Sequence, residues 1–95
     1  MNQKKALQEI ESNKDKLKQK GVSKIGLFGS IIHNKLNKKS DIDVLVEFNE
    51  ASFDNYAEVL ILLEKLLKRK IDLITKSSLR PELSYVKKEV KYARI

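Results

Sequence analysis

The chain has 95 residues, of which 41% are hydrophobic and 35% charged, a composition typical of one ordinary globular domain spanning residues 1–95. It contains no cysteine, so disulfides and cysteine metal sites are excluded. Segment 1–20 lacks the apolar stretch of a signal peptide, and the longest apolar run, Val59–Leu63, is too short to cross a bilayer, so we expect a cytoplasmic protein without a membrane partner. The net charge is +7, but the lysines are scattered along the chain, so we expect no specific nucleic-acid partner.

The spacing of apolar residues predicts an alternation of helices and strands. In chain order we expect helix 2–20 ended by Gly21, strand 22–28, a short helix 31–36 capped by Ser30, strand 41–48, helix 53–68, strand 71–75, and a helix from Pro81 to about Val90. This order predicts an α/β (α+β) domain in which a small three-stranded mixed sheet is covered by about four helices.

Strand 41–48 has the clearest alternation in the chain. One face carries Ile42, Val44, Val46 and Phe48, and the other carries Asp41, Asp43, Leu45 and Glu47. The two aspartates of one face are therefore about 6–7 Å apart along the backbone. When both are ionised they raise each other's pKa, and a divalent cation such as Mg²⁺ relieves that repulsion. The alternative is that both simply lie in solvent at a strand end.

Asp72 is a third candidate, because it stands between Ile71 and Leu73 in the strand predicted for residues 71–75. If that strand pairs beside strand 41–48, Asp72 joins Asp41 and Asp43; otherwise it lies on a wet face. Gly29-Ser30 stands where a strand gives way to a predicted helix, a place where backbone N–H groups bind phosphate, although a plain turn has the same composition. Carboxylates that hold Mg²⁺ opposite a phosphate cradle are the parts that nucleotidyl transfer requires.

These residues carry a family resemblance. Gly29-Ser30, ten intervening residues and Asp41-Ile42-Asp43 resemble the signature of the DNA polymerase beta-like nucleotidyltransferase superfamily. Segment 26–48, GLFGSIIHNKLNKKSDIDVLVEF, resembles its minimal nucleotidyltransferase (MNT) branch, as do KIDLITKSSLRPEL at 70–83 and VKKEVKYA near the end of the chain. The resemblance implies the nucleotidyltransferase fold.

The resemblance also implies roles for individual residues. Gly29 and Ser30 would bind the triphosphate, Asp41, Asp43 and Asp72 would hold Mg²⁺, and Asp72 would help to deprotonate the acceptor. The chain departs from the pattern after Gly-Ser, where the family has a small residue, an arginine and a glycine, and this chain has Ile32-His33-Asn34. His33 can replace the arginine in part or be an ordinary surface histidine.

Members of this branch are often encoded beside a HEPN-domain ribonuclease, and the resemblance implies an antitoxin that transfers AMP from ATP to that partner protein. The alternative is a non-catalytic module that neutralises the toxin by contact. Transfer to a small molecule and basic nucleic-acid binding are less favoured readings. Within helix 53–68, the run Val59–Leu63 is apolar around most of the circumference, so Ile61 or Leu62 is left to dock a partner or a second copy, unless another helix covers it.

Overall fold

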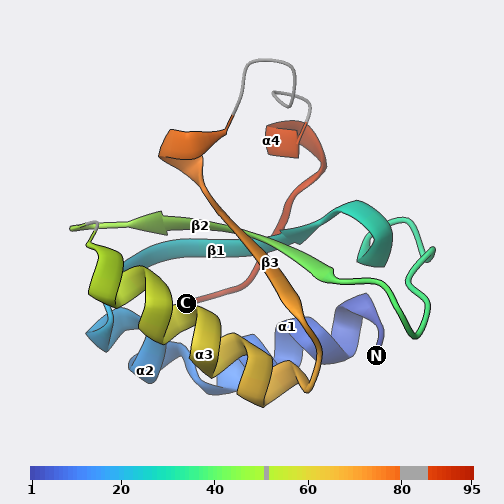
Figure 1. The fold of residues 1–95 in the computed structure, drawn as a ribbon, viewed down its shortest axis with the longest axis horizontal. Helices are drawn as coiled ribbons and strands as arrows, with labels where there is room; N and C mark the ends of the chain where they lie inside the picture. Colours follow the sequence, from blue (N-terminus) through green and yellow to red (C-terminus); the bar gives the residue numbers. More distant parts are fainter. Residues whose placement is uncertain (51, 80–85) are drawn as a thin grey trace.

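The computed structural model describes residues 1–50, 52–79 and 86–95 (Figure 1). The elements follow in chain order: α1 (Gln3–Ser12), α2 (Lys14–Gln19), β1 (Val22–Phe28), β2 (Ile42–Phe48), α3 (Phe53–Leu67), β3 (Ile71–Thr75), α4 (Val86–Glu89) and β4 (Lys91–Tyr92). Two short 3₁₀ turns, Gly29–Ile31 and Lys76–Ser78, follow β1 and β3. None of the helices in these described ranges is long and apolar enough to cross a membrane.

The strands form one mixed sheet in the order β3-β2-β1-β4. β1 runs antiparallel to β2 and to β4, whereas β2 and β3 are parallel, with α3 as the crossover between them. The expected class and mixed sheet are confirmed, but the sheet has a fourth strand. β4 pairs only Lys91 and Tyr92 with β1, and two residues are too few to produce a recognisable alternation.

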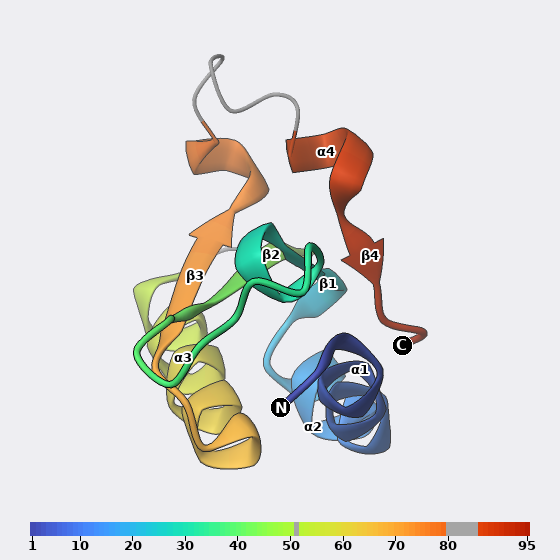
Figure 2. The ribbon, with the colours of Figure 1, turned by 90° about the vertical axis from the view of Figure 1, so that its right-hand side faces the viewer.

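The sheet separates two layers of unequal thickness. Figures 1 and 2 show α1, α2 and α3 against one face, and α4 above the other. The predicted alternation of β2 is confirmed, since Ile42, Val44 and Val46 belong to the large core on the three-helix side. Leu45 faces the other way, in a small cluster with Phe28 and Val86. The face that carries Asp43 is therefore only partly covered.

The first predicted helix is divided in two at Asn13. This residue leaves helical geometry with φ −115° and ψ 22°, and its side-chain amide donates to the carbonyl of Glu9. Asparagine competes with the helix for backbone hydrogen bonds, which explains the break. The apolar spacing survives it, because Ile10 and Leu17 are both fully buried. Of the helix predicted from Pro81, α4 covers residues 86–89, and residues 81–85 lie outside the described residues.

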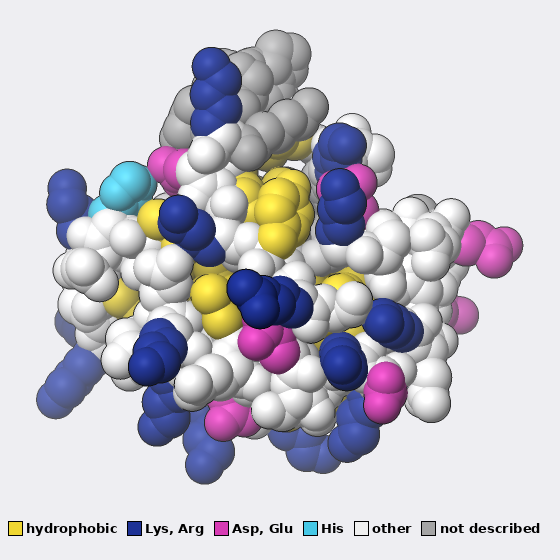
Figure 3. Space-filling view, turned by 180° about the vertical axis from the view of Figure 1, so that it is seen from behind, with side chains coloured by type: hydrophobic (Ala, Val, Ile, Leu, Met, Phe, Trp, Pro, Cys, Tyr) yellow, Lys and Arg dark blue, Asp and Glu magenta, His cyan; other side chains and the backbone are white. Residues whose placement is uncertain are grey.

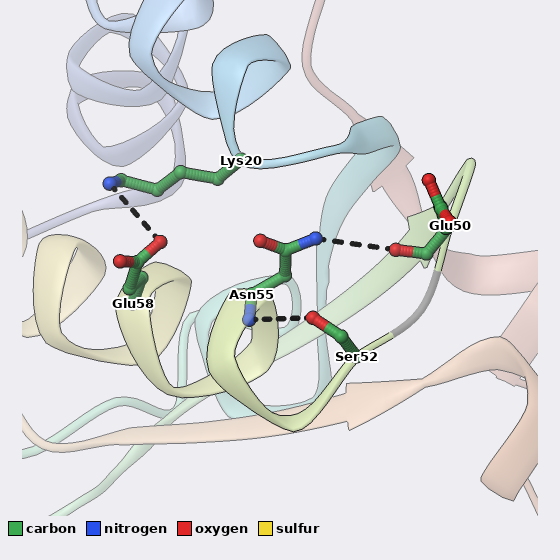
Figure 4. A network of polar contacts seen from close by, with 5 residues as sticks. All are labelled: Lys20, Glu50, Ser52, Asn55 and Glu58. Carbon is green, nitrogen blue, oxygen red and sulfur yellow. Dashed lines mark hydrogen bonds and ion pairs between the residues drawn. The ribbon is translucent and has the colours of Figure 1, made fainter.

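Polar contacts fix the beginning of α3 (Figure 4). The Ser52 hydroxyl accepts the N–H of Asn55 at 3.1 Å, and the Asn55 amide donates to the carbonyl of Glu50 at 3.3 Å. The ammonium of Lys20, just after α2, lies 3.7 Å from the Glu58 carboxylate. These contacts fix the beginning of the helix that connects β2 to the parallel strand β3.

The outer side of α3 is left partly apolar. Val59, Leu63 and Leu67 are buried against the sheet, whereas Ile61 is 64% exposed and Leu62 is half-buried. This confirms the expected surplus of apolar surface for Ile61. Lysines and arginines are spread over the face opposite to the view of Figure 1, without gathering into one patch (Figure 3).

Candidate functional site

Two carboxylates lie side by side on the open face of the sheet. In the parallel pairing of β2 with β3, Asp43 stands directly beside Asp72. Their neighbours Val44 and Leu73 are buried in the large core, so both aspartates point away from α1–α3. The strand pairing that the sequence left open is therefore present, and it brings Asp72 beside Asp43. Asp41 immediately precedes β2 and is exposed.

The electrostatics of this pair act on Asp43. Burial, and after it the negative charge of Asp72, raises the pKa of the Asp43 carboxyl from 3.8 to about 6. A hydrogen bond with the Asp72 side chain and the charge of Asp41 add smaller increases in the pKa, whereas a hydrogen bond from the Ser30 N–H lowers it. Asp43 is thus a half-buried acid that is unfavourably charged at neutral pH unless a cation is nearby.

The Gly29-Ser30 turn is packed directly against Asp43. Gly29 has φ +73°, in the left-handed region, and a Cβ atom added to it would lie 2.1 Å from Oδ2 of Asp43. Glycine is required here on both grounds. The backbone N–H of the next residue, Ser30, favours the ionised form of the same carboxylate and so lowers its pKa. The predicted cradle and the predicted acid Asp43 therefore meet, although twelve residues lie between Ser30 and Asp43 in the chain.

The predicted short helix 31–36, with Ser30 as its cap, is wrong. The helical geometry is limited to the 3₁₀ turn Gly29–Ile31, in which Phe28 holds the capping position without a side-chain hydrogen bond. Ser30 lies inside the turn, and its N–H is directed to Asp43. The chain leaves helical geometry at Asn34, whose φ is +56°.

The unusual residues His33 and Asn34 keep the turn intact. Asn34 occupies the position where the family has glycine, and it adopts the left-handed conformation that asparagine tolerates better than other side chains. Nε2 of His33 lies 3.0 Å from Oε2 of Glu89 at the end of α4. The other oxygen of Glu89 accepts the N–H of Gly29 at 3.1 Å. Asn34 therefore supplies a left-handed backbone conformation at the position where the family has glycine.

Sequence reasoning missed two residues that hold the site, Glu89 and Arg69. The guanidinium of Arg69 donates to the carbonyls of Asn37 and Ser40, the latter at 2.7 Å, and so fixes the loop that leads into Asp41. Contacts between side chains and distant backbone carry no periodic signal. The only hint of Glu89 was its place in the C-terminal segment that resembles the family.

The carboxylates suit a divalent cation. Among the described residues, no three histidine, aspartate or glutamate side chains are close enough to form a complete metal cluster. Asp43 and Asp72 are nevertheless neighbours whose charges repel, and the exposed Asp41 is near enough for its charge to act on Asp43. The carboxylate oxygens of Asp43 and Asp72 are donors of the kind that Mg²⁺ prefers, and a cation between them would relieve the repulsion.

Replacing Asn34 tests whether its backbone conformation is what the turn requires. We expect Asn34→Ala to lower the free energy of unfolding by about 1 kcal/mol, because alanine is strained at positive φ, whereas Asn34→Gly leaves it nearly unchanged. Urea unfolding monitored by circular dichroism measures both, with Lys35→Ala as the neighbouring control. Equal losses in the alanine and glycine variants would assign the role to the Asn34 side chain instead.

Known proteins resemble this chain in sequence. The model of the nucleotidyltransferase domain family matches residues 7–95. The protein adenylyltransferase MntA of Thermococcus cleftensis is 40% identical over 93 residues, covering 90% of this chain and 94% of the relative. A protein of Methanocaldococcus jannaschii, inferred to be a protein adenylyltransferase, is 46% identical over 80 residues, or 81% of this chain and 75% of the relative.

Solved structures share the fold. A protein inferred to be a minimal nucleotidyltransferase superposes with a TM-score of 0.82 at 26% identity, covering 96% of this chain and 95% of that one. An MNT antitoxin structure, solved in complex with the tri-AMPylated HEPN toxin of Shewanella oneidensis, gives a TM-score of 0.63 at 22% identity, over 93% of this chain and 71% of that one. The second likeness establishes the fold alone.

Proposed function

Because this chain belongs to the nucleotidyltransferase domain family, we propose that it is an adenylyltransferase that moves AMP from ATP onto a partner protein, with Mg²⁺ as its cofactor. The observation that carries the proposal is the contact between the Gly29-Ser30 turn and the Asp43–Asp72 pair. A turn able to approach phosphate and carboxylates able to hold a cation meet at one point on the open face of the sheet.

In this proposal each residue has a defined task. Gly29 and Ser30 bind the triphosphate, while Asp41, Asp43 and Asp72 hold the cation. The acceptor hydroxyl oxygen forms a bond to the α-phosphorus, the bond from that phosphorus to the oxygen bridging to the β-phosphorus breaks, and pyrophosphate leaves. The exposed Asp72 carboxylate takes the hydroxyl proton. Bound Mg²⁺ would neutralise charge on the triphosphate.

We further propose that the acceptor is a HEPN-domain toxin and that this protein is its antitoxin. The MNT resemblance supports this partner, as does the relative named as a protein adenylyltransferase. The apolar surface on α3 centred on Ile61 offers a protein partner a place to dock, since one helix stripe already packs on the sheet. Transfer of AMP to an accessible hydroxyl of the partner would then inactivate it.

The experiment is a transfer assay with the HEPN protein encoded beside this gene. Incubation with Mg²⁺ and ATP labelled in the α-phosphate should label the partner, and omission of Mg²⁺ or the change Asp43→Ala should remove the label. Equal labelling by wild type and Asp43→Ala, or none by either, contradicts the enzymatic proposal. Full protection of cells by Asp41→Ala would then favour neutralisation by contact.

A further inference from the structure

A carboxylate outside the predicted site holds the Gly-Ser turn from its other side. Glu89, the last residue of α4, has both of its oxygens engaged: Oε1 accepts the N–H of Gly29 at 3.1 Å, and Oε2 lies 3.0 Å from Nε2 of His33. These contacts span 60 and 56 residues of sequence. One side chain thus ties the C-terminal segment to the first residue of the turn and to His33, two residues after the turn ends.

Packing against the sheet fixes α4, the short helix that ends with Glu89. Val86, one turn earlier in α4, is 1% exposed and packs with Phe28 and Leu45 on the open face of the sheet. The N–H of Val90 donates to the carbonyl of Val86 at 3.0 Å, which closes the turn of helix around Glu89. The Glu89 side chain is itself only 21% exposed, so its carboxylate has little freedom to move away.

The turn needs such external support. It consists of three residues in 3₁₀ geometry, and its first residue, Gly29, is in the left-handed region. Gly29 lies between two carboxylates: its N–H donates to Glu89, and its α-carbon is packed against Asp43. A flexible glycine held in this way has one orientation, whereas loss of the bond to Glu89 frees its peptide planes to rotate.

We propose that Glu89 is a positioning residue of the nucleotide site. It orients the turn Gly29–Ile31 so that Ser30 faces Asp43 and can receive the triphosphate of ATP. This inference rests on the proposed function. Nε2 of His33 contacts the second oxygen of Glu89 on the outer side of the turn and so helps to hold the carboxylate in place. Glu89 itself does not touch the reacting atoms; it acts through the backbone that does.

The test compares Glu89→Ala and Glu89→Gln with Glu11→Ala. Glu11 is a matched control, because its carboxylate also accepts a backbone N–H of the C-terminal segment, that of Arg94 at 2.8 Å, but from α1 on the opposite face of the sheet. We expect Glu89→Ala to lower kcat/KM for transfer and the affinity for ATP with Mg²⁺ by roughly 10- to 100-fold. Glu89→Gln should recover most of the loss, because the glutamine carbonyl still accepts the Gly29 N–H. Glu11→Ala should leave both quantities unchanged.

A spectroscopic readout separates positioning from general stability. In nucleotide-free protein, the Gly29 amide proton should move upfield in Glu89→Ala, remain near its wild-type position in Glu89→Gln, and stay unchanged in Glu11→Ala. An unshifted Gly29 amide, or tighter ATP binding by Glu89→Ala, would overturn the proposal; the latter would show that the carboxylate competes with phosphate. Wild-type protein that transfers nothing defeats the proposed function, whereas active wild type with equally active Glu89→Ala defeats this inference alone.

Discussion

Asp43→Asn is expected to abolish nucleotidyl transfer while making the nucleotide-free protein more stable at neutral pH. Asparagine keeps the size of the side chain and can still accept the Ser30 N–H, but it removes the charge that a cation requires. Loss of one member of a catalytic set commonly lowers kcat by about 10³-fold or more, and we expect a decrease of that size. The gain in stability follows because the variant lacks the negative charge of Asp43, which is unfavourable in wild type since it is half-buried and repelled by Asp72.

The pH dependence of this gain has a defined sign. Burial and the charge of Asp72 raise the pKa of folded Asp43 to about 6, against 3.8 for the ordinary group. Between pH 3.8 and about pH 6, Asp43 is protonated more often in the folded protein than in the unfolded chain. The free energy of unfolding of wild type therefore falls as the pH rises from 3.8 to about 6. The asparagine variant has no such group. Its advantage should therefore be absent below pH 4, grow up to about pH 6 and remain constant above, at about 2 kcal/mol after allowing for solvent screening.

Urea unfolding of both proteins from pH 4 to pH 8 measures this difference. Asp54→Asn is a suitable control, because Asp54 is exposed in the first turn of α3, where a negative charge is favourable, and its loss should give no gain at any pH. Added Mg²⁺ should stabilise wild type above pH 6 and leave Asp43→Asn unaffected. A variant that is less stable than wild type at pH 7.5 would disprove the account of Asp43 given above.

The parts of the site that could be predicted from the sequence are the residues that lie in regular strands. The period of two in β2 places Asp43 opposite the core-facing Val44, and the same rule applied to β3 places Asp72 on the open face. Parallel pairing of the two strands was left open by the sequence, but once it is given, the two acids become neighbours without further adjustment. The period-two alternation of the strands was therefore sufficient to predict which face Asp43 and Asp72 occupy.

What could not be predicted depends on single contacts between distant segments. Ser30 was expected to cap a helix because its local sequence suits a cap, but it lies inside the 3₁₀ turn Gly29–Ile31, which is packed against Asp43. Asn13 divides the first helix through a side-chain bond to Glu9, which competes with a pattern that remains helical on both sides. The contact of Glu89 with Gly29 is invisible to any window of sequence, because 60 residues separate the two.

Gly29→Ala is the second change for which we expect a large effect. The new methyl group would lie 2.1 Å from Oδ2 and 3.0 Å from Cγ of Asp43, so the carboxylate or the turn must move. Alanine also pays about 1 kcal/mol or more in the left-handed region, where Gly29 has φ +73°. Either movement separates the phosphate cradle from the acids, and displacements of about 1 Å at such sites lower rates by roughly 10²-fold.

Gly21→Ala distinguishes this site-specific clash from backbone strain. Gly21 is also left-handed, with φ +83°, but the nearest atom to a Cβ there is the Asn55 side-chain amide nitrogen at 3.2 Å, which can shift aside, and the Glu50 carbonyl at 3.6 Å is in ordinary contact. Both variants should therefore lose stability in urea unfolding, but only Gly29→Ala should lose transfer of labelled AMP, by about 10²-fold or more. If the two variants retain equal activity when assayed well below their melting temperatures, the turn does not hold the triphosphate, because a cradle displaced from Asp43 cannot align ATP with the acids.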